Sequence, residues 1–195
     1  MNYAIFKEAI NQVTSISEED CNWFKDYLKP GQLRKNDFWV KEGQLCQNIG
    51  FIFSGLCRMY YLQDGREINV CFFMDNQFMT EYTSFLRHQP SKYYIQAMED
   101  TEFVSFSAES IEQSYLHSHS WERFGRKIAE FCYLEACSRT EAFLFYNGEQ
   151  RYLKLLEESP QIFQRIPLYH IASYLGLERE TLSRLRKKIT SNQIL

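Results

Sequence analysis

The stretch spanning residues 168–188, LYHIASYLGLERETLSRLRKK, restricts the possible folds more than any other part of the chain. Its apolar residues recur at helical spacing in two short runs, and Gly176 stands between them. Glycine adopts a positive φ at no steric cost, and Ala172 is small enough for two helices to cross closely. This pattern predicts a helix-turn-helix. Its internal contacts are expected from Ile171, Ala172, Leu175, Leu177, Leu182 and Leu185.

The second helix of this motif carries polar and cationic side chains on the face opposite to its leucines. Arginine and glutamate can hydrogen-bond to base edges in the major groove of DNA, and lysine and hydroxyl groups can bind phosphates. The face therefore predicts binding to double-stranded DNA, whereas an ordinary solvated face mixes charges of both signs more evenly. The predicted contacts are Arg179, Glu180, Thr181, Ser183, Arg184, Lys187 and Lys188.

The charge of the chain is distributed unevenly. The 195 residues carry a formal net charge of −3, which excludes a generally basic protein. From Arg151 onward, eight Lys or Arg stand against four Asp or Glu, a balance of +4, whereas the remainder has 14 basic against 21 acidic residues. A basic C-terminal part on an acidic body indicates a polyanionic partner for the C-terminal part alone.

None of the six cysteines belongs to a CxxC pair. Their spacing suits neither an iron–sulfur cluster nor a structural zinc site, so we expect no metal and no cofactor. The sequence shows neither a signal peptide nor a long apolar run, and we therefore expect a reduced, cytoplasmic setting without membrane association. The residues expected to act as small buried apolar groups are Cys21, Cys46, Cys57, Cys71, Cys132 and Cys137.

Helical patterns open the chain. Residues 3–13 predict a first helix, and residues 18–28 predict a second one with a capping-box-like start at Ser17. Pro30-Gly31 is expected to end the second helix.

Between Gly31 and Ser107 the pattern changes to short β-type runs separated by turn signals. Asp64-Gly65 stands between two apolar runs and predicts a hairpin. Many short strands at such spacing predict a β-roll, a jelly-roll-like arrangement within an α+β chain. The predicted runs are residues 38–40, 49–53, 56–62, 67–73, 93–97 and 102–106.

Residues 120–146 return to helical spacing and predict one long helix. Its apolar stripe either packs against the β-roll or pairs with a second copy of the chain, as in a coiled coil, and we expect a dimerisation helix. The positions of the stripe are Trp121, Phe124, Ile128, Phe131, Glu135, Ser138, Ala142 and Phe145.

The long helix is followed by a break and by further short helices. Asn147-Gly148 interrupts the helical pattern and is interpreted as a hinge. Residues 150–158 predict a short helix, and Pro167 suits the first turn of the helix after it. The predicted domains are 1–119, a β-roll with N-terminal helices, 120–147, a dimerisation helix, and 148–195, a helix-turn-helix domain.

This order of elements resembles the Crp/Fnr family of bacterial transcription regulators over residues 30–189. Arg179-Glu180-Thr181 followed by Arg184 is the most specific part of the resemblance. It implies a cyclic-nucleotide-binding-like sensor domain and a winged-type helix-turn-helix, here with a reduced wing because only residues 190–195 follow the motif. Other residues that carry it are Glu42-Gly43, Ser54-Gly55, Asp64-Gly65-Arg66-Glu67, Phe78-Met79-Thr80-Glu81, Ala142-Phe143-Leu144 and Gly148.

The resemblance implies roles for the helix-turn-helix residues, because matching family residues read a TGTGA-like half-site. Arg179 would bind guanine through its O6 and N7 atoms, and Glu180 would accept from the N4 amino group of cytosine. Arg184 would bind a second guanine or a phosphate. The remaining polar residues, Ser183, Lys187 and Lys188, would hold phosphates.

The resemblance also implies a small-molecule pocket in the roll. Glu81 keeps the carboxylate that holds a ribose hydroxyl in cyclic-nucleotide-binding members, but Ser91 stands where the phosphate-binding arginine is expected. A hydroxyl replaces a guanidinium fork poorly, and Lys92 falls on the opposite face of its strand. We therefore expect an effector other than cyclic AMP or cyclic GMP. The predicted pocket residues are Thr80, Glu81, Tyr82, Ser91 and Lys92.

Two other functions compete with a homodimeric regulator. A metal-dependent cupin enzyme needs His-x-His on a strand, but His117-Ser118-His119 precedes the long helix instead. A signalling module would use the basic helix to bind an acidic protein. We expect a non-enzymatic transcription regulator, with RNA polymerase as a further partner.

Overall fold

The computed structural model describes residues 3–192, with side chains to residue 189. The described chain divides into two compact units. The first unit holds the described residues up to Tyr61 together with Cys71–Cys132, and the second holds Leu62–Val70 and the described residues from Tyr133 onward. The long helix α5 (His119–Phe145) contributes to both units.

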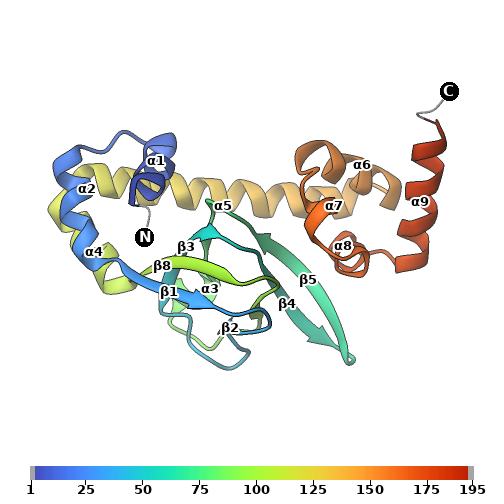
Figure 1. Cartoon of the computed structure of the whole chain (residues 1–195), viewed down its shortest axis with the longest axis horizontal. Helices are drawn as coiled ribbons and strands as arrows, with labels where there is room; N and C mark the ends of the chain where they lie inside the picture. The colour runs from blue at the N-terminus through green and yellow to red at the C-terminus, as the bar shows by residue number, and fades with distance from the viewer. Residues whose placement is uncertain (1–2, 193–195) are drawn as a thin grey trace. The chain divides into compact units, whose positions relative to one another are not determined.

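Apart from residues 62–70, which belong to the second unit, the predicted roll lies in the first unit and is built from two antiparallel sheets (Figure 1). One sheet has the strand order β1-β8-β3-β6 and the other has the order β2-β7-β4-β5. The α+β, jelly-roll-like fold is confirmed. The strands are β1 (Lys29–Leu33), β2 (Phe38–Val40), β3 (Asn48–Ser54), β4 (Cys57–Gln63), β5 (Arg66–Phe73), β6 (Phe78–Met79), β7 (Tyr94–Ala97) and β8 (Thr101–Ser107).

Alternation along the strands divides the apolar side chains between two cores. One core lies between the sheets and includes Ile52, Met79 and Ile95, each with 0% exposure. The other core lies between the β1-β8-β3-β6 sheet and the helices, where Phe6 and Phe24 pack with Phe51. The helices of this unit are α1 (Tyr3–Val13), α2 (Glu18–Phe24), η1 (Lys25–Tyr27), α3 (Tyr82–Arg87), α4 (Ala108–His117) and the first part of α5.

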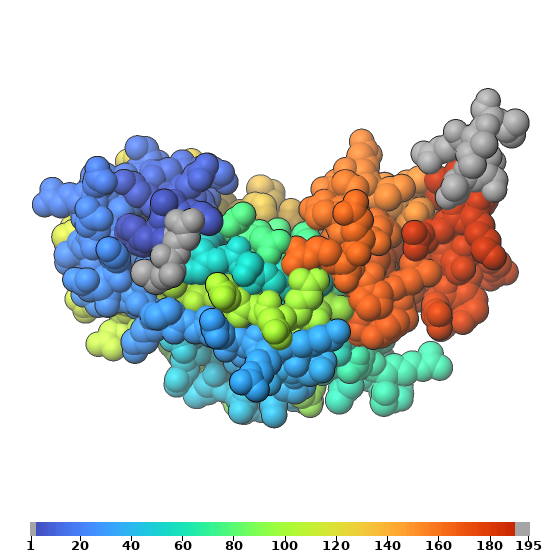
Figure 2. Space-filling view, in the orientation of Figure 1, coloured from blue at the N-terminus to red at the C-terminus, as the bar shows by residue number. Residues whose placement is uncertain are grey.

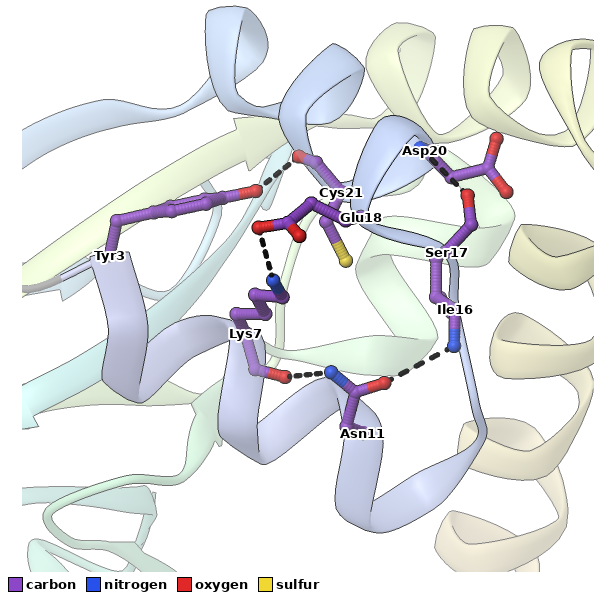
Figure 3. A network of polar contacts seen from close by, with 8 residues as sticks. All are labelled: Tyr3, Lys7, Asn11, Ile16, Ser17, Glu18, Asp20 and Cys21. Atoms are coloured by element: carbon purple, nitrogen blue, oxygen red, sulfur yellow. Dashed lines mark hydrogen bonds and ion pairs between the residues drawn. The ribbon is translucent and has the colours of Figure 1, made fainter.

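The two N-terminal helices are joined by a set of polar contacts that Figure 3 shows. Ser17 caps α2, because its Oγ accepts from the backbone N–H of Asp20 at 3.0 Å, as its sequence position predicts. Lys7 forms an ion pair with Glu18 at 3.0 Å. The hydroxyl of Tyr3 donates to the carbonyl of Cys21, and burial, with the nearby Cys21, raises the pKa of Tyr3 to about 12.

The expectation that Pro30-Gly31 ends the second helix is wrong. The α-helical part of the second helix already ends at Phe24, and the 3₁₀ helix η1 follows it. Pro30 and Gly31 lie within strand β1, at the edge of the sheet, where a missing N–H is tolerated. Gly31 is needed there because a Cβ would lie 2.4 Å from the ring of Phe103.

Strand β6 and helices α3, α4 and α7 (Ile162–Arg165) were not expected from the sequence. Strand β6 has two residues and α7 has four, so neither shows a recognisable period. Helix α3 depends on Glu81, which serves as its N-cap in place of the usual Ser, Thr, Asp or Asn.

The second unit contains the predicted C-terminal helices α6 (Gly148–Glu158), α8 (Leu168–Leu175) and α9 (Arg179–Asn192), together with the unexpected α7. Helix α9 includes residues 190–192, so these residues form no wing, and residues 193–195 lie outside the described residues. Pro167 is the N-cap of α8, one position earlier than expected.

Helix α5 divides the predicted apolar stripe between its two ends. Trp121 and Phe124 are buried in the helix-covered core of the first unit, so this end of the stripe packs against the β-roll, which was the alternative to dimerisation. Ile128 also packs against this core, but further along the helix Phe131 is 60% exposed and Phe145 is 74% exposed. The apolar surface of the later turns is therefore available to a partner.

Candidate nucleic-acid interface

The helix-turn-helix is formed by α8 and α9, and its turn has the predicted glycine geometry. Gly176 ends α8 with φ 64° and ψ 40°, a left-handed conformation, and its N–H donates to the carbonyls of Ala172 and Ser173. The backbone N–H of Leu177 donates to the carbonyl of Ala172 at 2.9 Å. The side chain of a larger residue at position 176 would also meet Phe143, because a Cβ there would lie 2.8 Å from its ring.

Most of the predicted internal contacts of the motif are buried. Ile171, Ala172, Leu175 and Leu182 are at most 3% exposed, whereas Leu177 and Leu185 are half-buried. The same unit buries further apolar residues from α6, α7 and the segment before α8, namely Tyr152, Leu155, Ile162 and Ile166. Packing on this scale fixes α9 on α8, so the polar face of α9 is presented by a rigid support.

The start of α6 is held against the turn of the motif. Asn147 caps α6 in a capping box with Gln150, which ends the long helix where the sequence predicts a break. A Cβ on Gly148 would lie 2.5 Å from a methyl group of Leu177, so a larger residue would require the Leu177 side chain to shift. Arg151 adds a hydrogen bond from its Nε to the carbonyl of Leu175 at 3.0 Å.

The hairpin tip Leu62–Val70 packs on α8 within the same unit. Asn69 is fully buried, and its backbone N–H donates to the Oγ of Ser173 at 3.0 Å. The Nδ2 of Asn69 lies 3.2 Å from the Nδ1 of His170, which is 5% exposed. Ser173 donates in turn to the carbonyl of Glu67 at 2.8 Å. Through these contacts the hairpin tip supports the helix-turn-helix. No sequence pattern predicts this role of the tip.

Helix α9 lies at the surface of the second unit, where the red atoms of Figure 2 mark it. Arg179, Glu180, Arg184, Lys187 and Lys188 are exposed, and Thr181 and Ser183 are half-buried. The Nη2 of Arg184 lies 3.4 Å from the hydroxyl of Thr181, one turn earlier. Lys188 contacts the carboxylate of Glu149 on α6 at 3.0 and 3.2 Å. The structure thus places all the predicted DNA-contacting residues on one helix, with their charged ends outward.

The predicted effector pocket lies in the first unit, and its carboxylate is engaged within the chain. Glu81 is 4% exposed, and its two oxygens accept from the backbone N–H groups of Thr83 at 3.0 Å and Ser84 at 2.9 Å. Thr80 donates to the carbonyl of Asn48 at 3.2 Å. Tyr82 is half-buried, and its ring is parallel to that of Phe85 within 13°.

The strand alternation expected at Lys92 does not apply, because Ser91 and Lys92 both precede β7 (Tyr94–Ala97), but the two side chains differ in exposure. Ser91 is 3% exposed, whereas Lys92 is exposed. The hydroxyl of Ser91 accepts from the N–H of Tyr93 at 3.0 Å and lies 2.9 Å from the carbonyl of the same residue. The position at which a guanidinium is expected thus holds a hydroxyl that already has local partners. The residues of this site do not fit a cyclic phosphate.

Known proteins resemble this chain in the sequence of the roll and in the fold of most of the chain. Residues 30–117 match the family described as the cyclic nucleotide-binding domain. The fold is similar to that of FixK2 from Bradyrhizobium japonicum, with 18% identity, a TM-score of 0.72, and 86% of this chain and 87% of that chain covered. No curated protein matches the sequence.

Two further solved structures share the architecture. The Catabolite Activator Protein of Thermus thermophilus is 14% identical, with a TM-score of 0.60 and coverage of 95% of this chain and 88% of that chain. A regulator assigned to the Crp/Fnr family from Eubacterium rectale is 20% identical, with a TM-score of 0.66 and coverage of 91% and 85%. The fold of the chain is Crp/Fnr-like. The resemblance predicted from the sequence is confirmed.

The two histidines of the His-x-His motif lie at the junction of α4 and α5. His117 ends α4 and His119 begins α5, so neither lies on a strand. The ring of His117 stacks on Trp23 with centroids 4.0 Å apart, and its Nε2 lies 3.3 Å from a carboxylate oxygen of Asp20. Within residues 3–192 no group of three or more His, Cys, Asp or Glu is placed to hold a metal ion.

The six cysteines are free thiols in the structure. Three are buried, Cys21, Cys46 and Cys57, and three are half-buried, Cys71, Cys132 and Cys137. Burial raises the pKa of Cys57 to about 12, so its thiol stays protonated at neutral pH. In the part of the chain that the structure describes, no helix has the length and apolar character needed to cross a bilayer.

Proposed function

We propose that this chain is a homodimeric, sequence-specific DNA-binding transcription regulator. The observation that carries the proposal is the polar face of α9, which extends from Arg179 to Lys188 on a buried apolar support. A helix of this kind enters the major groove, where its first turns reach base edges. The proposed transcriptional role also rests on the Crp/Fnr-like fold.

Each recognition residue has a proposed role that its position supports. Arg179 and Glu180 lie in the first turn of α9 and would contact guanine and cytosine. Arg184 would contact a second guanine or a phosphate. The hydroxyls of Thr181 and Ser183 and the ammonium groups of Lys187 and Lys188 would position the helix on the phosphate backbone.

A second copy of the chain would cover the open apolar surface of α5. Side chains that large are seldom left exposed together on a monomeric protein. Pairing through this surface would relate two recognition helices by a two-fold axis, so that they would enter successive major grooves about 34 Å apart. The exposed residues that would pair are Phe131, Tyr133, Leu134, Leu144 and Phe145.

The roll would act as a sensor for an effector other than a cyclic nucleotide. Ser91 in place of an arginine and the engaged oxygens of Glu81 support the exclusion of cyclic AMP. Effector binding would change the pose of the recognition helices through the predicted hinge at Asn147-Gly148. RNA polymerase would be the partner on the bound promoter.

Binding of the purified full-length chain to duplex DNA tests this function. One duplex carries two TGTGA-like half-sites with two-fold symmetry, and a control duplex has the same composition in scrambled order. We expect tighter binding to the first duplex and a steep loss of affinity with rising salt, because several phosphates are contacted. Equal affinity for both duplexes would overturn the assignment of α9 to base reading. Weak, salt-insensitive binding would favour a signalling module with a protein partner.

A further inference from the structure

The last cation of the recognition face is engaged by an acid from another helix. The Nζ of Lys188 lies 3.0 Å and 3.2 Å from the two carboxylate oxygens of Glu149. The side chain of Lys188 is 59% exposed and that of Glu149 is 38% exposed, so the pair lies at the surface of the second unit. Lys188 and Arg184 are four residues apart, and both therefore lie on the face proposed to meet DNA.

Glu149 has a fixed position relative to the recognition helix. It is in the first turn of α6, where the helix dipole stabilises a negative charge. The residue before it, Gly148, contacts Leu177 of the turn, and Arg151 donates to the carbonyl of Leu175. The backbone that carries Glu149 is therefore held on the helix-turn-helix, and its carboxylate is held within reach of Lys188.

We propose that Glu149 sets the overall DNA affinity of the chain by competing with phosphate for Lys188. This inference depends on the proposed DNA-binding function. A carboxylate presents two anionic oxygens to an ammonium group, as a DNA phosphate does, so both ligands use the same donors. In free protein the ammonium is bound to Glu149, and DNA binding requires Lys188 to exchange this partner or to share it.

The strength of the pair suits such a competition. Exposed ion pairs contribute little to stability, so the contact with Glu149 can be exchanged when a phosphate approaches. Because Lys188 is assigned to the backbone and not to a base, Glu149 weakens binding to all sequences by the same factor. The ratio of affinities for preferred and scrambled DNA is therefore independent of Glu149.

The test compares duplex binding of the full-length chain with that of Glu149→Gln, using one preferred and one scrambled duplex at low salt. We expect Glu149→Gln to bind both duplexes about two- to five-fold more tightly, the range expected for loss of one exposed pair. Its affinity should fall more steeply with salt, by no more than about 0.9 in the logarithmic slope, because one more phosphate contact forms.

Two further variants separate competition from a general charge effect. Glu157→Gln removes the same charge from an exposed position on the same helix and should change affinity clearly less than Glu149→Gln. In a chain that already carries Lys188→Gln, the Glu149→Gln change should have no further effect on affinity. Glu149→Asp keeps the charge but shortens the side chain, and it should give an intermediate affinity.

The outcomes also distinguish this inference from the proposed function. If the unaltered chain binds no duplex, the proposed function fails and the inference fails with it. If the unaltered chain binds but Glu149→Gln is indistinguishable from it or from Glu157→Gln, the competition is absent while DNA binding stands. A selective gain on the preferred duplex alone would also contradict the competition, because it would place Lys188 in base reading.

Discussion

The cassette of the roll, residues 78–91, and the recognition helix α9 both carry the pattern of the Crp/Fnr family, but their polar groups are used differently. In the cassette, Glu81 caps α3 and the hydroxyl of Ser91 contacts the backbone of Tyr93. In α9, Arg179 and Arg184 remain exposed. The same kind of sequence pattern therefore belongs to internal hydrogen bonds in one unit and to an exposed surface, proposed here to recognise DNA, in the other.

The two regions differ in whether their polar groups already have hydrogen-bond partners within the chain. A carboxylate that already accepts two backbone N–H groups stabilises the chain itself, whereas an exposed guanidinium on a rigid helix can still choose a partner. Four experiments test this difference between the cassette and α9.

The largest effect is expected where the support of α9 is removed. Leu182 is fully buried between α9 and the rest of the motif, and Leu182→Ala leaves a cavity there. We expect a loss of about 2–5 kcal/mol in the free energy of unfolding, measured by urea denaturation. Leu185→Ala, at a half-buried position of the same helix, should cost clearly less. Equal losses would contradict the proposed support of the recognition face.

A smaller effect is expected at the recognition face itself. Arg179→Ala removes a base-reading group, so binding to the preferred duplex should weaken by about 1–3 kcal/mol while binding to scrambled DNA changes little. Lys187→Ala should instead weaken both duplexes alike, because it removes a phosphate contact. Fluorescence anisotropy with the two duplexes measures both effects. If the two variants behave in the same way, the division between base and phosphate contacts is wrong.

In the cassette, Glu81→Gln is expected to lower the free energy of unfolding by about 0.5–2 kcal/mol, the range for the loss of an N-cap. Glu81→Gln removes one of the two acceptor oxygens and the charge at the start of α3. Thermal unfolding should therefore occur at a lower temperature. Glu112→Gln, at an exposed position on α4, is the matched control and should leave the unfolding temperature unchanged. If Glu81→Gln is as stable as the unaltered chain, the Glu81 carboxylate does not stabilise α3 and is free to bind a ligand.

The smallest expected effect is the absence of a response to cyclic AMP. Because Ser91 replaces the expected arginine, adding cyclic AMP at about 1 mM should not raise the unfolding temperature. A ligand present at 100 times its Kd would stabilise the folded state by about 2.7 kcal/mol, so real binding would be visible. A clear increase with cyclic AMP but not with AMP would contradict the description of the cassette.

The sequence predicts the parts of the fold that depend on local periodicity. The first helix, the long helix and the helix-turn-helix repeat apolar residues at helical spacing, and Gly176 marks the turn between α8 and α9. Asn147 marks the break after α5 because a cap residue has its own side-chain signature. These features are encoded within a few neighbouring residues.

The elements that sequence reasoning missed depend on distant partners. Strand β1 contains Pro30 and Gly31, and only its pairing with β8 and its contact with Phe103 explain why a strand forms there. Likewise, the contact of Asn69 with His170 joins residues that are 101 positions apart. No local pattern announces such contacts, because each residue is ordinary in its own segment.

The most direct test of the central claim is a selection of binding sites from random duplex DNA by the purified, full-length chain. We expect enrichment of a motif with two-fold symmetry whose half-sites are about 10 base pairs apart, as expected for two recognition helices in successive major grooves. The Arg179→Ala variant should enrich a motif with a relaxed preference at one position of each half-site. Recovery of sequences without any shared motif, in the presence or absence of small molecules, would contradict the account.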